Sequence, residues 1–403
     1  MRILQINTTI NTGSTGRIAE DIGQLLIKKG HQSFIAFGRD ENRNSSSSKI
    51  KIGSKKDFYS HILLTRIWDK HGFGSLNETK KFLEKISLIQ PDIIHLHNIH
   101  GYFIHVGILF QFLKELNKPI VWTFHDCWPF TGHCAYFERV NCQKWQTQCQ
   151  QCPLTHEYPK SLIIDNSFNN FNDKKKAFTG LKDLHIITPS KWLSALVKKS
   201  FLKEYPVEVI NNGIDLNTFR PIKNHLKSKK PIILGVASTW SESKGLLDFV
   251  NLQKRLLDEV EIVLIGLSKQ QIKNLPIGIK GIERTESIEE LAEWYNKASV
   301  FINPTYADNF PTTNIEALAC GTPVITYNTG GSPEVIDINT GAVVEKGDID
   351  GLTNAIKRIL KKDLNMVAQN CRKRAETYFN KEERFQDYLD LYNSVLNNHI
   401  AKQ

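Results

Sequence analysis

Two carboxylates flank the start of one expected helix, in the stretch ADNFPTTNIEALACGTPVI, residues 307–325. Asp308 directly precedes Asn-Phe-Pro, and Glu316 follows Thr313 by three residues. That spacing is the capping-box pattern, so it predicts a helix that begins near Thr313 and ends before Gly321. A carboxylate only accepts hydrogen bonds and can take two hydroxyl donors. The alternative, that Glu316 merely caps its own helix, leaves Asp308 unexplained.

Strands are expected on both sides of this helix. Residues 300–306 and 324–327 are rich in β-branched and aromatic side chains, and turn residues end both runs. Strand, helix and strand in so short a stretch predict a parallel βαβ unit. Ligands bind outside the carboxyl ends of the strands in such sheets, where the Asp308 loop and the Gly330 loop both fall. We therefore place the candidate site at this edge.

The same alternation runs through the whole chain and predicts an α/β fold with two doubly wound domains that face each other across a cleft. A loop, NTGSTG, separates the first strand from a helix at about 17–29. The predicted domains are 1–211 and 212–380, connected near 212–230, and a last amphipathic helix, 381–403, is expected to pack back on the first domain. The predicted strands are 3–6, 34–37, 93–96, 120–124 and 185–188 in the first half, and 232–236, 261–265, 300–303 and 324–327 in the second.

Composition limits the class of protein. The chain has 403 residues, of which 40% are hydrophobic and 23% charged, as in globular proteins. With neither a signal peptide nor a membrane-spanning segment expected, we predict a cytoplasmic protein with reduced thiols. The net charge is +10, but the cations are scattered, as at 174–176, 227–230 and 372–374, and no nucleic-acid motif is present. A basic surface still attracts anionic lipid and phosphorylated substrates.

Five of the seven cysteines lie between residues 127 and 152. Cys149 and Cys152 have the spacing of a metal-binding pair, and Cys134 and Cys142 precede them. Four thiolates form a tetrahedral structural zinc site that leaves no position open for a substrate. Four free buried thiols fit the sequence equally well, so both interpretations stay open.

A set of motifs in fixed order resembles a known family. In the second half the motifs are VINNGIDLNTFRP (209–221), SESKGL (241–246), VLIG (263–266), DNFPTTNIEALACGTPVI (308–325), TGGSPEVI (329–336) and TGAVVEKGD (340–348). In the first half they are TGSTGRIAEDI, IIHLHN, TFHDCWPFTGHC and ITPSKWL. Together they resemble the retaining GT-B glycosyltransferases of family 4, also called glycosyl transferases group 1. Bacterial enzymes of capsule, O-antigen and exopolysaccharide assembly are especially similar.

The resemblance assigns roles to the second half. Glu316 would accept hydrogen bonds from the ribose of a nucleotide-sugar donor, and Asp308, where the family usually has Glu, would face the transferred sugar. Lys244 would bind the diphosphate, with Gly245 allowing close backbone approach. The family's upstream arginine is absent, and Thr239 stands near its expected place. The backbone beside the donor would come from Asn309, Phe310, Pro311 and Thr312.

Other roles fall to the first half. The loop with Gly13 and Gly16 would face the donor phosphates, while Ser14 and Thr15 cap the next helix. Arg17 is a candidate for the missing cation. Four residues that follow or end strands complete the set. His125 would lie beside the transferred sugar and Asn98 near the acceptor, and we expect His95 and His97 to pack at the cleft rather than bind a metal.

The resemblance implies transfer of a sugar, with retention, from a UDP- or GDP-sugar to a hydroxyl of a glycan or lipid-linked acceptor, without a metal cofactor in catalysis. The alternatives are a nucleotide-sugar epimerase and a non-catalytic nucleotide-sugar-binding protein. Residues 58–73 predict a helix whose apolar face, Phe58, Ile62, Leu63 and Ile67, is flanked by cations. That face would either bind the inner surface of the cytoplasmic membrane or pack into the first domain's core.

Overall fold

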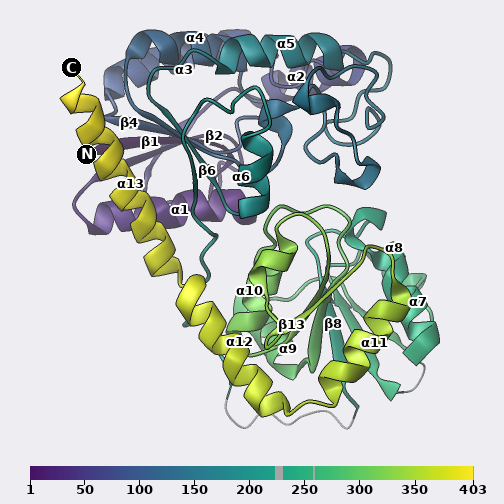
Figure 1. Ribbon diagram of the computed structural model, residues 1–403. Coiled ribbons are helices and arrows are strands. Elements are labelled where there is room, and N and C mark those ends of the chain that lie inside the picture. The colour runs from purple at the N-terminus through teal and green to yellow at the C-terminus, as the bar shows by residue number, and fades with distance from the viewer. Residues whose placement is uncertain (223–229, 257–258, 403) are drawn as a thin grey trace. The chain divides into compact units, whose positions relative to one another are not determined.

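The computed structural model describes residues 1–222, 230–256 and 259–402. The chain divides into two compact units, each described by itself: unit 1 is Met1–Ile210 with Phe385–Gln403, and unit 2 is Asn211–Arg384 (Figure 1). The connection predicted at 212–230 includes residues 223–229, which lie outside the described residues.

Unit 1 is built on a seven-stranded parallel sheet with the order β3-β2-β1-β4-β5-β6-β7. The order reverses between β1 and β4, where Ile6 pairs with Leu96. All five predicted strands are confirmed; β3 and β7 escaped prediction because they are short and polar edge strands, SKIK and VEV. The strands are β1 (Arg2–Thr9), β2 (Gln32–Arg39), β3 (Ser48–Lys51), β4 (Ile93–Leu96), β5 (Ile120–Thr123), β6 (Leu184–Thr188) and β7 (Val207–Val209).

Helices cover both faces of this sheet. The larger core cluster joins side chains such as Leu4 and Trp122 to α3, α4 and α5, and the alternate residues Ile3 and Val121 face α1 and α13 (Figure 1). The helices are α1 (Gly13–Lys28), α2 (Lys55–Trp68), α3 (Leu76–Ile89), α4 (Val106–Leu116), α5 (Ser167–Phe178), α6 (Lys191–Val197) and α13 (Lys381–Ala401).

The first helix begins earlier than predicted. α1 starts at Gly13 rather than near residue 17, and its N-cap is Thr12, which makes no side-chain cap hydrogen bond. Ser14 and Thr15 therefore lie inside the first turn, and the prediction that they cap the helix is wrong. The reason is that Gly13 takes a left-handed backbone, with φ of +67°, so the turn closes one residue ahead of the serine.

Unit 2 has a six-stranded parallel sheet with the order β10-β9-β8-β11-β12-β13, which reverses between β8 and β11. The four predicted strands are confirmed. The two missed strands, β10 and β13, lie at the edges of the sheet, and each contains a glycine, which is depleted in strands. The strands are β8 (Ile232–Val236), β9 (Glu261–Ile265), β10 (Ile279–Ile282), β11 (Val300–Asn303), β12 (Val324–Tyr327) and β13 (Gly341–Val344).

The helices of unit 2 also form two layers, so the predicted doubly wound architecture is confirmed for each unit. One core cluster joins the sheet to α9, α10 and α12, and the other joins it to α7 and α11. No helix in the described part of the chain combines the length and the apolar character needed to cross a bilayer. The helices are α7 (Leu246–Leu256), α8 (Lys269–Lys273), α9 (Ile288–Lys297), α10 (Thr312–Ala319), α11 (Ile349–Leu360) and α12 (Leu364–Tyr378).

The last helix is tied to unit 1 by polar contacts inside its core. In α13 the Tyr392 hydroxyl lies 2.6 Å from Nδ1 of His95, and the Tyr388 hydroxyl lies 3.2 Å from the Thr123 hydroxyl. All four side chains are buried. The fold of unit 1 therefore depends on residues from both ends of the chain.

We expect Tyr392→Phe to lower the free energy of unfolding by about 1–3 kcal/mol, because it leaves a buried nitrogen of His95 without its partner. Chemical denaturation of the full chain measures this. Tyr378→Phe, at an exposed tyrosine of α12, is the matched control and should change little. Equal effects of the two substitutions would show that the buried contact contributes nothing.

Candidate functional site

Three loops meet at the carboxyl edge of the unit 2 sheet, as predicted. The loop after β11 accepts a hydrogen bond at the Asn309 carbonyl from the N–H of Gly331, in the loop after β12 (2.9 Å). It also donates from the N–H of Tyr306 to the carbonyl of Ser243, in the turn after β8 (2.8 Å). This turn is η4 (Glu242–Lys244). The meeting point lies where the strand order reverses, which is the usual ligand position in doubly wound sheets.

The two charged residues singled out in these loops contact each other. The Lys244 ammonium lies 2.7 Å from Oδ2 of Asp308, and the side chains are 35% and 18% exposed. The cation and the anion are thus held side by side at the site's edge, still within reach of solvent. A ligand that carries negative charge can exchange with Asp308 as the partner of the ammonium.

Gly245 makes this arrangement possible. Its φ is +74°, and a Cβ at this position would lie 2.3 Å from the Pro304 carbonyl oxygen. Any other residue would push η4 away from the end of β11. Glycine is thus required here by the close approach of Pro304, and the approach of a diphosphate stays a prediction.

Glu316 does not cap its helix. α10 begins at Thr312 with Pro311 as N-cap and has no side-chain cap hydrogen bond, so the capping-box prediction is wrong. Pro311 fixes φ near the helical value, which starts the helix early and puts Thr313 inside its first turn. Glu316 is buried, and its Oε2 accepts a hydrogen bond from the Tyr295 hydroxyl of α9 (2.8 Å). Nothing in the sequence signalled Tyr295, because the contact joins separate helices.

The rest of the predicted donor-binding stretch forms the body of the loop. Asn309, Phe310 and Pro311 are buried, and Thr312 is half-buried in the first turn of α10. The Phe310 carbonyl accepts a hydrogen bond from Asn212 at 3.4 Å. These residues therefore set the course of the chain between Asp308 and Glu316.

A cavity of about 430 Å³ lies beside these loops, at the carboxyl ends of β8, β9 and β10. Thr239, a predicted site residue, lines it together with Gln271 and Arg284. Gly266 also lines it, and the Cβ of any other residue there would lie 1.6 Å from the Ala237 carbonyl oxygen. Arg284 was missed because it follows β10, a strand that the sequence did not reveal.

In unit 1 the corresponding edge carries Gly13, Gly16 and Asn98. A Cβ on Gly16 would lie 2.8 Å from the Thr9 hydroxyl, so glycine lets the start of α1 pack against the end of β1. Arg17 is exposed and donates to the Gly13 carbonyl. The backbone N–H of Asn98, after β4, donates to the side chain of Asn7 at the end of β1 (3.2 Å).

His125 follows β5 at the same edge and lies 3.2 Å from His97. His97 also lies 3.0 Å from Gln5, and His95 lies within hydrogen-bonding distance of Thr123 and Tyr392. Both of these histidines therefore already contact protein groups. Burial lowers the pKa of His125 to about 4 and outweighs the opposing effect of Asp126. The imidazole is therefore neutral near pH 7 and can orient a ligand without carrying charge.

A hydrogen-bond network next to His125 joins the buried His100 and Asp126 to the partly exposed Tyr158, and nothing in the sequence signalled it. Nε2 of His100 lies 2.8 Å from the Asp126 carboxylate, and its Nδ1 lies 2.9 Å from the Tyr158 hydroxyl. Burial alone would raise the pKa of Asp126, but His100 and the Trp128 N–H lower it overall. The carboxylate holds the His100 ring in place, and that ring in turn holds Tyr158.

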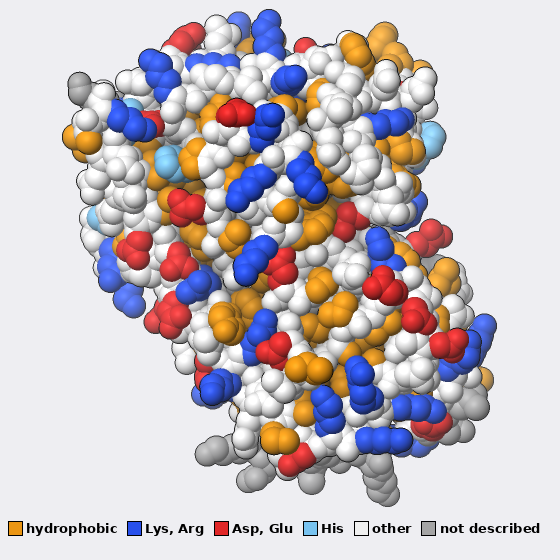
Figure 2. All heavy atoms as spheres, viewed as in Figure 1, with side chains coloured by type: hydrophobic (Ala, Val, Ile, Leu, Met, Phe, Trp, Pro, Cys, Tyr) orange, Lys and Arg blue, Asp and Glu red, His pale blue; other side chains and the backbone are white. Residues whose placement is uncertain are grey.

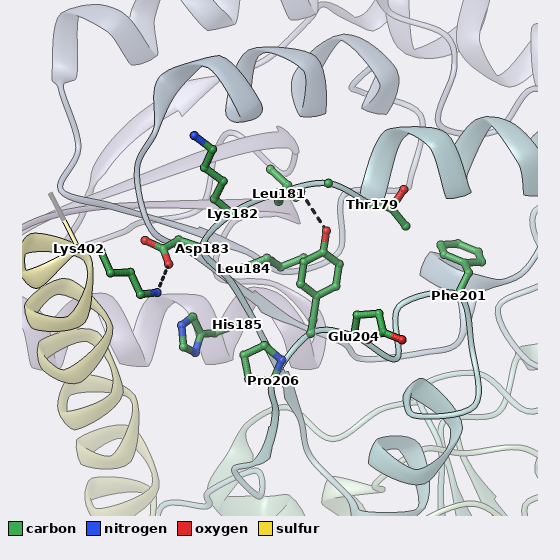
Figure 3. A pocket seen from close by; sticks show the side chains of 12 residues that line it. Thr179, Leu181, Lys182, Asp183, Leu184, His185, Phe201, Glu204, Pro206 and Lys402 are labelled. Carbon is green, nitrogen blue, oxygen red and sulfur yellow. Dashed lines mark hydrogen bonds and ion pairs between the residues drawn. The ribbon is translucent and has the colours of Figure 1, made fainter.

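A second cavity, of about 460 Å³, lies at the opposite edge of the unit 1 sheet (Figure 3). It sits at the amino ends of β6 and β7, where Lys402, directly after α13, reaches Asp183 at 2.7 Å. None of the residues predicted for the site lines it. We therefore do not include it in the candidate site.

Known proteins resemble this chain over nearly its whole length. A family model described as Glycosyltransferase Family 4 matches residues 15–218, and one described as Glycosyl transferases group 1 matches residues 230–362. WcaC of Escherichia coli K12, described as a glycosyl transferase of colanic acid biosynthesis, is 24% identical over 98% of this chain and 100% of its own. CapM of Staphylococcus aureus, described as a capsular polysaccharide biosynthesis glycosyltransferase, is 24% identical over 50% of this chain and 59% of its own.

Solved structures share the fold. Sucrose-phosphate synthase from Thermosynechococcus elongatus superposes with a TM-score of 0.74 at 20% identity, covering 98% of this chain and 99% of its own. HepE from Anabaena, solved with UDP, has a TM-score of 0.68 at 14% identity and covers 98% of this chain and 100% of its own. The predicted GT-B fold is confirmed by this likeness.

The buried histidines predict acid sensitivity. Burial lowers the pKa of His125 to about 4 and that of His61 to about 3, from 6.5 in the unfolded chain. The unfolded chain thus binds more protons below about pH 6.5, and stability falls as the pH drops towards 4, by at most about 1.4 kcal/mol per unit and histidine. Thermal unfolding between pH 7.5 and 5 measures this loss. His125→Gln, which does not titrate, should flatten the profile, and an unchanged slope would contradict the assignment.

Proposed function

This chain belongs to glycosyltransferase family 4, and on that premise we propose that it transfers a sugar from a UDP- or GDP-sugar to a hydroxyl of a lipid-linked glycan during assembly of a surface polysaccharide. The observation that carries the proposal is the meeting of Lys244, Asp308 and the Glu316 helix at one sheet edge. The relatives WcaC and CapM, with their descriptions, support the polysaccharide context.

The donor is held by charge and by hydroxyl contacts. Glu316, fixed by Tyr295, accepts hydrogen bonds from the ribose hydroxyls. Lys244 leaves Asp308 to bind the diphosphate, and Asp308 then faces the hydroxyls of the transferred sugar. HepE, of the same fold, was solved with UDP-glucose, which supports a nucleotide-sugar donor.

The cavity of about 430 Å³ beside the site is large enough for the nucleoside. Thr239 and Gln271 offer hydrogen-bonding groups to it, and Arg284 offers a second positive charge. We assign Arg284, rather than Arg17, as the cation that takes the place of the family's missing arginine, because it lines the same cavity as Thr239.

The mechanism rests on charge stabilisation and orientation. The bond between the sugar and the diphosphate breaks, the acceptor oxygen forms the new bond on the same face, and its proton passes to the departing phosphate oxygen. Lys244 stabilises the charge that grows on that phosphate. His125, neutral near pH 7, orients the sugar. A nucleotide-sugar epimerase would interconvert two donors without an acceptor, and a sensor would convert none.

An exposed apolar patch supports contact with the membrane. On α2 the exposed large hydrophobic side chains are Tyr59, Leu63 and Trp68. The apolar face predicted for residues 58–73 is therefore wrong in part. Phe58 packs against Tyr102, with ring centroids 5.9 Å apart, and both Phe58 and Ile62 are half-buried.

A neighbouring loop extends this surface. The N–H of Leu162 donates to the Arg66 carbonyl of α2 (2.7 Å), and Leu162 and Ile163 are 58% and 71% exposed. We call Tyr59, Leu63, Trp68, Leu162 and Ile163 the α2 patch. Figure 2 shows Lys and Arg side chains spread among Asp and Glu on the visible face, without a large basic region. The α2 patch has Arg66 and Lys160 beside it, and it is therefore our candidate for a surface that binds anionic lipid.

Glu316→Gln should weaken donor affinity roughly 10- to 100-fold, since hydrogen bonds to a charged group contribute about 1.5–3 kcal/mol. Calorimetric titration with the nucleoside diphosphate, UDP or GDP, measures this affinity. Glu289→Gln, at an exposed position of α9, is the control. Wild-type affinity in the Glu316 variant would remove this residue from the donor site.

Lys244→Ala should lower kcat about 10²- to 10³-fold and raise KM much less, because the ammonium stabilises charge that grows in the transition state. Steady-state kinetics with varied donor separates the two constants. Lys254→Ala, at an exposed lysine of α7, should behave as wild type. A change in KM alone would mean that Lys244 only binds.

Leu63→Asp should reduce binding to vesicles rich in anionic lipid while sparing turnover of a short water-soluble acceptor. Sedimentation with vesicles at low and high salt measures binding, and salt should release the wild type. Leu88→Asp, at an exposed leucine of α3 outside the α2 patch, is the control. Equal loss in both variants, or no binding by the wild type, would contradict a role for the patch.

A further inference from the structure

Residues 124–166 of unit 1 connect β5 to α5 without a helix longer than one short turn. The described structure here consists of loops and three 3₁₀ turns: η1 (Trp128–Phe130), η2 (Glu138–Val140) and η3 (Lys144–Gln146). Irregular segments of this length are uncommon in compact domains unless something holds them. This one is nevertheless part of the main hydrophobic cluster of unit 1.

Four cysteines of this segment line one small cavity. Cys134, Cys142, Cys149 and Cys152 surround a space of about 20 Å³, and all four are free thiols. A cavity needs roughly 10–15 Å³ to admit one water molecule, so this space fits one small ion and excludes organic ligands. The fifth cysteine of the segment, Cys127, does not line it.

The wall of this cavity is partly apolar. Phe137, Trp145 and Pro153 lie among its lining residues, together with polar ones such as Lys144 and Gln150. Cys134 and Cys149 are buried, whereas Cys142 and Cys152 are partly exposed.

A buried histidine also lines the cavity, and one of its two ring nitrogens has no hydrogen-bond partner. His133 lines it, and its Nδ1 is held by the Asp69 carboxylate at 2.5 Å, whereas its Nε2 is buried with no hydrogen-bond partner. The ammonium of Lys174 is buried nearby, where it donates to the carbonyls of Trp128 and Thr131. A negatively charged metal–thiolate centre would be stabilised by both neighbours.

We propose that Cys134, Cys142, Cys149 and Cys152 bind one zinc ion as a structural site. Each thiol loses its proton to solvent, and four sulfur ligands complete a tetrahedron that leaves no position for substrate. Within residues 1–222, 230–256 and 259–402, no three His, Cys, Asp or Glu side chains are already arranged as metal ligands. Binding therefore requires the cysteine side chains to turn inward until each sulfur lies about 2.3 Å from the ion. The ion then supplies the cross-links that the irregular segment lacks.

Elemental analysis of the purified full chain tests the proposal, which stands independently of the proposed function. We expect about one zinc per chain in the wild type, from the four-thiolate stoichiometry. Cys149→Ser and Cys152→Ser should lose most of it. Cys127→Ser, in the same segment but outside the cavity, and Cys371→Ser, in unit 2, should keep it. Loss of zinc from all four variants alike, or a wild type without zinc, would overturn the site.

Two measurements keep the test decisive if the serine variants fail to fold. Cobalt exchanged into the wild type should show the absorption of tetrahedral thiolate ligation. Mass spectrometry after alkylation without reduction should show the four thiols protected until a chelator removes the metal. A Cys134–Cys152 disulfide, or immediate alkylation of all four thiols in the native protein, would show that the cysteines serve without a metal.

Discussion

Parallel strand pairing is the constraint on which the rest of the structure depends. Every pairing in both sheets is parallel, so each loop that follows a strand lies at the same edge. In unit 2 this brings the turns after β8, β11 and β12 together, and in unit 1 it aligns the loops after β1, β4 and β5. Gly245 then allows the last step, the contact with Pro304 that sets Lys244 beside Asp308.

Each of the two carboxylates singled out at the site has a partner within unit 2. Glu316 is oriented by the Tyr295 hydroxyl, while Asp308 is neutralised by Lys244. An unpaired carboxylate at such depth would be costly, so these contacts stabilise the site. Under the proposed function, a donor would exchange the ion pair for a phosphate contact and leave Asp308 to face the sugar.

The sequence predicted the buried strands and the edge where the site lies, because hydrophobic runs and turn residues are local signals. It could not predict contacts between separate elements, such as Tyr295 with Glu316 or His100 with Asp126. The capping-box pattern misled because Pro311 starts α10 before Thr313. Arg284 was missed since β10 is a half-exposed edge strand, and the α2 face was misjudged because Phe58 packs inward against Tyr102.

We propose that unit 2 binds a nucleotide sugar, and thermal unfolding with a panel of UDP-, GDP- and ADP-sugars measures that binding. A ligand at one hundred times its dissociation constant stabilises a protein by about 2.7 kcal/mol. We predict that the sugars of one nucleotide, UDP or GDP, raise the melting temperature and that the free sugars do not. No shift with any member of the panel, or an equal shift with free sugars, would show that unit 2 does not bind a nucleotide sugar.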